Sequence, residues 1–172
     1  MWFRSCNAWT IFVAATVSCA PAVFSGHEFN DGRAHFTLRE IPPAYDRIDV
    51  ATASLAFRDR VDRASILINV RCETRDEDTP LPALTNHLLM GTTERDFRSQ
   101  EIEPWSGREA HHSVLTAKQD GVRVLYDLFV AKKDGCIYDF VYVADLDAPE
   151  AGRHKFESMF RAVKVLPGAR RQ

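Results

Sequence analysis

The chain has 172 residues, of which 45% are hydrophobic and 27% are charged. This is the mixture of an ordinary globular protein with a single domain, and it excludes a disordered chain, a fibrous chain and a multi-span membrane protein. The 22 Lys and Arg residues against 24 Asp and Glu residues leave a formal charge of -2. That charge excludes the strongly basic surface of a general nucleic-acid binder, so no nucleic-acid partner is expected.

Residues 1–25 have the composition of an export signal peptide. Arg4 is the only charge in this segment, and an uncharged apolar run follows from Ala8 to Ser18. A membrane anchor is the alternative, but the run is short for a span and Pro21 interrupts it. The sequence therefore predicts export to the periplasm or to a membrane-tethered position in the cell envelope.

Two processing points compete in this leader. Residues 16–19 resemble a bacterial lipobox, in which the cysteine, here Cys19, becomes the lipidated first residue of the mature protein. Thr16 stands where a lipobox usually has an aliphatic residue. Ordinary cleavage after Ser25 is the alternative, with Val23 and Ser25 as the small residues. Lipidation is favoured, and residues 26–34 are expected to be a linker.

Two cysteines, Cys72 and Cys136, lie in the folded part of the chain. In an exported domain such a pair indicates one disulfide, with two unpaired buried thiols as the alternative. The sequence has no Cys-x-x-Cys pair or Cys/His ladder, so no metal site is expected.

The first half of the folded part is expected to form short strands and one helix. The alternation of Ile66, Ile68 and Val70 is typical of a strand, and the acidic residues 73–78 read as a solvated loop instead of a calcium site. A helix should begin at Thr79 and Pro80 and end near Gly91. The expected strands span 35–41, 45–50, 54–58 and 64–72.

The second half is expected to form an antiparallel meander. Strands over 98–105, 109–119, 122–132 and 136–144 are joined at Gly107 and at two Asp-Gly pairs, a strong hairpin signal. Two-residue turns would place Phe129 opposite Phe140 and Val124 opposite Ala117.

A final helix follows Asp147 and Pro149, and a basic tail spans residues 167–172. Its apolar residues recur at helical spacing and predict one buried face: Phe156, Met159, Phe160 and Val163. The fold class is therefore α+β, with two helices covering an antiparallel sheet in one domain over residues 35–166.

This order of elements, with Asp-Gly hairpins before a helix of sequence FESMFRAVKVL, resembles the PsbP-like fold. That fold is shared by extrinsic proteins of the oxygen-evolving complex and a Ran-binding nuclear import factor. The chain is also similar to small uncharacterised bacterial envelope lipoproteins through LAFRD (55–59), GREA (107–110) and KKDGCIYDFVYVA (132–144). The resemblance implies a non-catalytic accessory or binding module, and it transfers no catalytic residue.

Catalytic motifs are missing, but one pair of side chains is a candidate. The nucleotide-binding, GxSxG and HExxH patterns do not occur, and no cofactor is expected. The expected register places His112 opposite Phe129 and one diagonal from Asp127, where it could be a general base. The alternative is a polar pair on a half-covered face. His111 must point to the other face.

Trp105 before the Gly107 turn is a candidate anchor of an exposed binding surface, or it packs beneath the hairpin. The leading hypothesis is an exported, non-enzymatic accessory protein that binds an envelope protein or an apolar ligand. The alternatives are a hydrolase-like enzyme that uses His112 and Asp127, and a lipid-binding accessory of an envelope transporter.

Overall fold

The computed structural model describes residues 23–72 and 78–167. Cys19, the segment 73–77 and the tail from residue 168 onwards lie outside these residues, so the predictions that fall on them stay predictions. Within the described part of the chain, no helix is long and apolar enough to cross a membrane.

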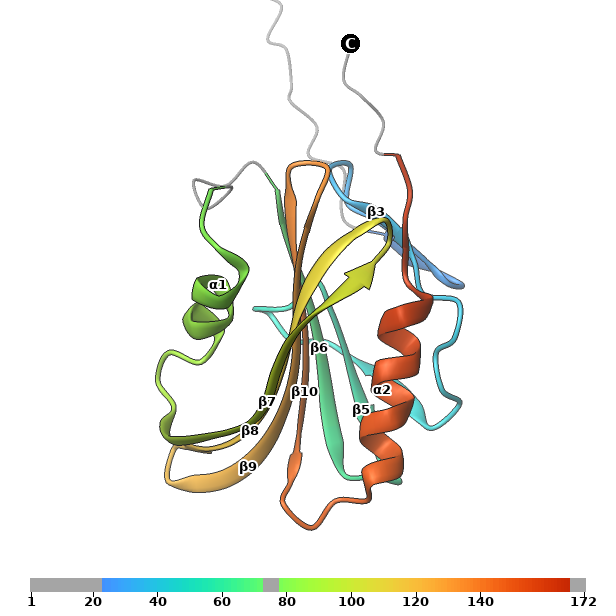
Figure 1. Ribbon diagram of the computed structural model, residues 1–172. Helices are drawn as coiled ribbons and strands as arrows, with labels where there is room; N and C mark the ends of the chain where they lie inside the picture. The colour runs from blue at the N-terminus through green and yellow to red at the C-terminus, as the bar shows by residue number, and fades with distance from the viewer. Residues whose placement is uncertain (1–22, 73–77, 168–172) are drawn as a thin grey trace, which may run out of the picture.

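A seven-stranded antiparallel sheet forms the centre of the molecule (Figure 1). Its strand order is β4-β5-β6-β10-β9-β8-β7, so the early strand β6 pairs with the late strand β10. The expected α+β class with an antiparallel sheet is confirmed. The strands are β4 (Tyr45–Ile48), β5 (Leu55–Asp59), β6 (Ala64–Cys72), β7 (Thr93–Trp105), β8 (Arg108–Gln119), β9 (Val122–Lys133) and β10 (Cys136–Asp145).

The Asp-Gly hairpins have the expected register. Phe129 pairs with Phe140, and Val124 pairs with Ala117. In the β9–β10 turn, Asp134 and Gly135 have φ angles of 52° and 74°. A two-residue turn with positive φ at both positions matches the twist of the flanking strands, which explains the preference for this dipeptide. β7 starts five residues earlier than expected and carries two register shifts against β8.

A second sheet contradicts the predicted linker over residues 26–34. β1 (Val23–Ser25), β2 (Glu28–Asn30), β3 (His35–Thr37) and β11 (Lys164–Val165) form a four-stranded antiparallel sheet in that order. Phe29 in β2 is 1% exposed, and its ring stacks on Phe36 at 4.8 Å. The linker prediction is wrong because strands of three residues are too short to show a hydrophobic period.

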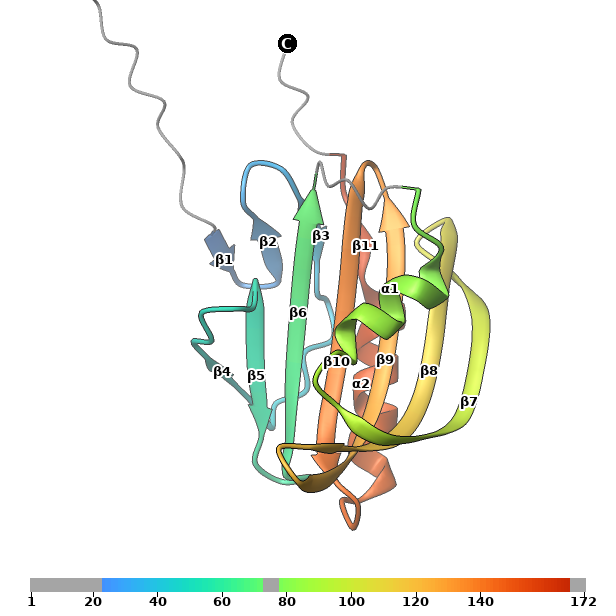
Figure 2. The same ribbon diagram turned by 90° about the vertical axis from the view of Figure 1, so that its left-hand side faces the viewer.

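The two helices lie on opposite faces of the large sheet (Figure 2). α1 (Leu81–Leu88) contacts β8 and β9. Its residue Leu84 is fully buried against the sheet, while Leu88 is only partly buried. Its N-cap is Pro80, which keeps an extended backbone, and not the expected Thr79. α2 (Glu150–Ala162) covers the other face with the buried residues Phe156, Met159 and Phe160.

A disulfide joins the first half of the large sheet to its last hairpin. Cys72 ends β6 and Cys136 begins β10, and the register places them directly opposite each other. Their Cα atoms are 4.0 Å apart and their sulfurs are bonded. The predicted pairing of these two cysteines is confirmed.

Candidate functional site

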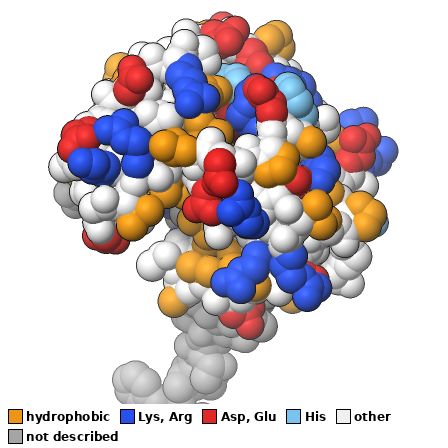
Figure 3. Space-filling model, turned by 90° about the horizontal axis from the view of Figure 1, so that it is seen from below, with side chains coloured by type: hydrophobic (Ala, Val, Ile, Leu, Met, Phe, Trp, Pro, Cys, Tyr) orange, Lys and Arg blue, Asp and Glu red, His pale blue; other side chains and the backbone are white. Residues whose placement is uncertain are grey.

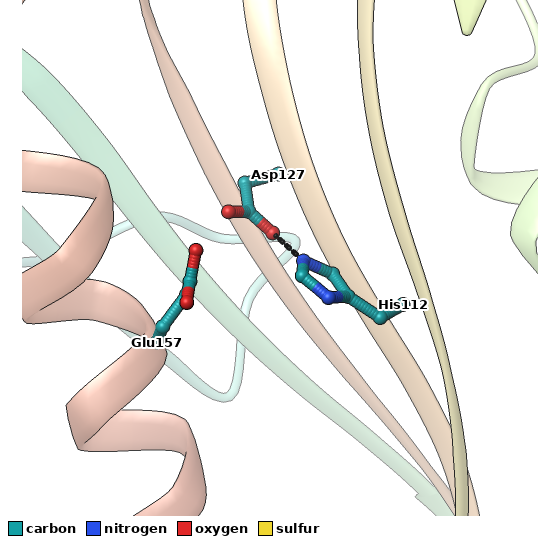
Figure 4. A group of neighbouring side chains, drawn as sticks. All are labelled: His112, Asp127 and Glu157. Carbon is teal, nitrogen blue, oxygen red and sulfur yellow. Dashed lines mark hydrogen bonds and ion pairs between the residues drawn. The ribbon is translucent and has the colours of Figure 1, made fainter. Parts of the chain in front are cut away.

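His112 and Asp127 meet on the face of the sheet that α2 covers (Figure 4). His112 lies in β8, and Asp127 lies in the neighbouring strand β9, one diagonal away. The ring Nε2 of His112 donates to Asp127 Oδ1 over 2.8 Å. His111 points to the opposite face, where its Nδ1 is hydrogen-bonded to Thr85 Oγ1 of α1 at 2.8 Å. The structure thus brings together the pair that the expected register placed side by side.

Helix α2 contributes charged groups that the sequence analysis did not find. Arg153 Nη1 donates to Asp127 Oδ2 over 3.3 Å and also to Glu157 Oε1, while its Nη2 donates to Glu150 Oε1 over 2.6 Å. Glu150, Arg153 and Glu157 are spaced i, i+3 and i+7 on the helix. That spacing places the three side chains on one face of the helix, and it is the signal in the sequence that could have indicated an ion-pair cluster there.

The ion pairs continue to the edge of the sheet. Arg161 donates to Glu157 Oε2 over 3.0 Å and to Glu103 Oε2 of β7 over 3.1 Å. From His112 through Asp127, Arg153, Glu157 and Arg161 to Glu103, ionisable side chains of alternating type connect three strands with α2. We call these six residues the charged row. The charged row fixes the position of α2 across the strands, because β7 and β9 each supply a carboxylate that binds an arginine of the helix.

An aromatic stack holds the imidazole of His112 in place. Its ring lies over Phe129 at 3.9 Å, and Phe129 stacks on Phe160 of α2 at 3.8 Å. Trp105 continues the stack on the far side of Phe160, with ring centroids 5.6 Å apart. These rings fill the space between the sheet and this part of α2, where a lipid-binding accessory would need a cavity.

The prediction of Trp105 as an exposed anchor is wrong. Its side chain is 2% exposed, and its indole Nε1 donates to the carbonyl of Phe160 over 3.2 Å. The cause is the strand's alternation, since Trp105 falls on the same face of β7 as Glu103, which contacts α2. The alternative, packing beneath the hairpin, describes the structure.

Burial controls the protonation of the site. Asp127 is fully buried, and loss of solvent raises the pKa of its carboxyl although His112 and Arg153 act against the rise. Burial lowers the pKa of His111, and the neighbouring His112 contributes a smaller effect in the same direction. Among the described residues, His112 contacts the carboxylate of Asp127 and the ring of Phe129, and neither is a nucleophile that a base could activate.

Three groups of this site have the chemistry of metal ligands. One nitrogen of His112 and one oxygen each from Asp127 and Glu157 lie within 4.8 Å of one another. The guanidinium of Arg153 contacts both carboxylates, so it already supplies a positive charge where an ion would bind. A divalent ion would have to displace that guanidinium, and the arrangement fits a structural ion-pair network better than a metal site.

A second buried acid lies on the other face of the sheet. Asp139 of β10 is 1% exposed, and Arg71 Nη2 of β6 donates to its Oδ2 over 3.1 Å. Burial raises the pKa of this carboxyl against the effect of Arg71. The sequence did not reveal this partner because β6 and β10 are far apart along the chain.

An open groove runs between α2 and the segment before β4. Its volume is about 590 Å³, and Ile41, Pro42 and Pro43 make one wall apolar. Lys155 lies on the helical side, where its Nζ donates to Asp62 Oδ2 over 2.6 Å. The remaining lining residues are Glu40, Ala151, His154 and Ser158. Sequence reasoning missed this groove because its walls come from segments about 110 residues apart.

No family model matches the chain, and no curated protein does. Solved structures match its fold. The cyanobacterial PsbP (CyanoP) of Synechocystis sp. PCC 6803 is 13% identical, with a TM-score of 0.58 over 89% of this chain and 97% of its own. The fold is PsbP-like.

Two further structures share this PsbP-like fold. LpqN of Mycobacterium tuberculosis, described as involved in cell envelope biogenesis, is 13% identical with a TM-score of 0.57, over 86% of this chain and 90% of its own. PA94 of Pseudomonas aeruginosa, of unknown function and described as a putative regulator, is 7% identical with a TM-score of 0.53, over 86% and 96%. At these identities the likeness concerns the fold.

Proposed function

We propose that this protein is an exported, non-enzymatic accessory or binding protein of the cell envelope, tethered to the membrane by a lipid on Cys19. The observation that carries the proposal is the disulfide between Cys72 and Cys136. Disulfides persist in oxidising compartments and are rare in the cytosol, so this bond agrees with the export signal of residues 1–25.

Strand β1 supports processing at Cys19 over cleavage after Ser25. Cleavage after Ser25 would remove Val23–Ser25, the residues that pair with β2. It would also remove Phe24. The ring of Phe24 meets that of Phe57 edge to face with centroids 6.3 Å apart, and its centroid lies 5.1 Å from the guanidinium carbon of Arg47. Processing before Cys19 leaves the whole of β1 in the mature protein.

The charged row supports a non-enzymatic role. A general base needs access to a substrate proton and a nucleophile or water to activate. Asp127 has no exposed surface, and Arg153 holds its second oxygen. The described contacts of the His112–Asp127 pair attach α2 to the sheet, which is a structural task. LpqN, which shares the fold, is described as involved in cell envelope biogenesis, and this likeness supports an envelope role.

The groove beside α2 is the surface that we propose for binding. Its apolar wall of Ile41, Pro42 and Pro43 suits an apolar ligand or an apolar segment of an envelope protein. On the face seen in Figure 3, basic and acidic side chains are mixed and hydrophobic ones lie in small groups. That face therefore has no dominant charge that would select a partner.

The test of tethering compares the full chain with its Cys19→Ala variant. We expect the unaltered chain in the membrane fraction and the variant in the released periplasmic fraction. Thiol labelling of the denatured mature protein without reductant should detect no free Cys72 or Cys136. Unchanged membrane retention of the variant would contradict the lipid anchor, and two reactive thiols would contradict the oxidising location.

The test of binding is affinity capture of the mature protein from its own membranes, followed by identification of bound proteins and lipids. A Ser158→Arg variant places a large side chain in the groove, and we expect it to lose the specific partner. The matched control, Glu109→Arg, changes an exposed residue outside the groove and should keep it. Equal capture by both variants would exclude the groove as the binding surface.

A further inference from the structure

The two described ends of the chain lie in one row of the small sheet. Val23, the first residue of β1, pairs with Asn30, and Asn30 pairs with His35. The backbone N–H of Leu166, just after β11, donates to the carbonyl of His35 over 2.8 Å. Because successive strands of this sheet run in opposite directions, the chain enters β1 and leaves β11 at the same end of the sheet.

The two chain exits lie close together, and Cys19 lies close to the start of β1 along the chain. Neighbouring strands are about 4.8 Å apart, so three spacings separate the two exits by roughly 14 Å. In the sequence, three residues stand between Cys19 and Val23. Four steps of extended chain reach at most about 14 Å. A lipid on Cys19 would therefore keep the start of β1 close to the membrane surface.

Two turns of the molecule share this end (Figures 1 and 2). Tyr138 of β10 meets Phe36 of β3 edge to face, with ring centroids 6.1 Å apart, so the β9–β10 hairpin packs against the small sheet. Burial raises the pKa of the Tyr138 hydroxyl to about 12, and Asp134 and Asp31 act in the same direction. Beside the β9–β10 turn, a cavity of about 240 Å³ has three basic lining residues, Arg108, Lys132 and Lys133.

Two of the three basic side chains of this cavity donate hydrogen bonds to backbone carbonyls. Lys133 Nζ donates to the carbonyl of Ser106 over 2.5 Å, and Lys132 Nζ donates to the carbonyl of Thr79. Asp134 is the acidic residue among those lining the cavity. Three basic side chains against one acidic side chain among the described lining residues suit the phosphate groups of phospholipids.

Resting on the proposed lipid anchor, we propose that this end of the molecule lies on the phospholipid surface. We call it the exit end; it comprises the start of β1, the end of β11, and the β2–β3 and β9–β10 turns. The opposite end, with the β8–β9 turn, then points away from the membrane. Val122 begins β9 just after that turn, and the full length of β9 separates it from Lys133, about 36 Å at 3.3 Å per residue.

Site-directed spin labels on the lipidated protein test this orientation. In the proposed mature chain Cys19 is acylated and Cys72 is bonded to Cys136, so one added cysteine is the only free thiol. The variants are Arg33→Cys in the exposed β2–β3 turn, Val23→Cys at the start of β1 and Val122→Cys as the distant control. Each is bound to vesicles of phosphatidylethanolamine and phosphatidylglycerol, and its collisions with a water-soluble relaxation agent are measured.

We expect vesicles to reduce the collision rate at positions 23 and 33 by at least about threefold, and to leave position 122 nearly unchanged, because only the exit end lies within reach of the interface. If the protein binds vesicles through Cys19 but all three positions stay equally accessible, the orientation is wrong while the anchor holds. If Cys19→Ala leaves vesicle binding unchanged, the anchor itself is wrong. The two failures are therefore distinguishable.

Discussion

Phe160 lies at the centre of the contacts that hold α2 on the sheet. It is fully buried, stacks on Phe129 and Trp105, and meets Phe140 edge to face. Phe160→Ala removes this ring and leaves a cavity, so we expect a loss of about 3–5 kcal/mol in the free energy of unfolding. Urea denaturation measures the loss. Met90→Ala, at a residue 73% exposed, should change it little.

The sequence predicts only the part of the candidate site that follows from the register of β8 against β9. His112 and Asp127 were found because both flank the Asp120-Gly121 turn, and a two-residue turn determines every pair along β8 and β9. Arg153 and Glu157 were not found, since nothing local states which face of α2 meets which strand. Trp105 was ambiguous for the same reason, because alternation along β7 shows which residues share its face but not that α2 covers that face.

At the scale of elements, the disulfide closes a loop of 64 residues in sequence separation. The chain-entropy model assigns to such a loop a stabilisation of about 4 kcal/mol, because the crosslink restricts the unfolded chain. We expect the double variant Cys72→Ala, Cys136→Ala to lose up to that amount in urea denaturation. Adding reductant should destabilise the unaltered protein and leave the double variant unchanged; equal behaviour would indicate that the bond is absent.

Strand β1 makes a separate prediction about the start of the mature domain. A chain that begins at Gly26 lacks Phe24 and its contacts with Phe57 and Arg47. Given the partly buried ring and the cation–π contact, we expect this chain to be less stable by about 1–3 kcal/mol than one that begins at Ala20. Thermal and urea denaturation of both forms provide the comparison. Equal stability would remove the structural argument against cleavage after Ser25.

Elements were predictable where their signal is local and long. The expected strand over 64–72 matches β6 residue for residue, and the Asp-Gly hairpins have the expected pairs. The four strands of the small sheet have two or three residues each, so their pairing comes from tertiary packing around Phe29 and Phe36. β3 lies within the strand expected over 35–41, whereas β1, β2 and β11 are too short to display a hydrophobic period.

For the whole molecule, the two buried acids predict how stability depends on pH. Burial raises the pKa values of Asp127 and Asp139 above the ordinary value of 3.8. The folded state therefore holds these protons more tightly than the unfolded state, and each carboxyl's contribution is largest below pH 3.8. That contribution is lost as the pH rises through the raised pKa.

The variants Asp127→Asn and Asp139→Asn isolate these contributions. We expect the free energy of unfolding of the unaltered protein, minus that of each variant, to decrease as the pH rises from 3.8 towards neutrality. Urea denaturation at a series of pH values measures the difference. Glu109→Gln, at an exposed residue, is the control and should give a flat difference. A difference that increases with pH would contradict the assignment.

The strand order of the large sheet determines when the domain can fold. β6 is complete at residue 72, yet the neighbour that covers its second edge, β10, begins at residue 136. A chain is made from its N-terminus, so the hydrogen-bonding edge of β6 and the thiol of Cys72 wait for more than sixty further residues. A ribosome-bound fragment that ends before β10 cannot close the sheet. The domain therefore reaches its native state only after nearly the whole chain has been synthesised, and until then the chain stays in the unfolded form that the proposed export would require.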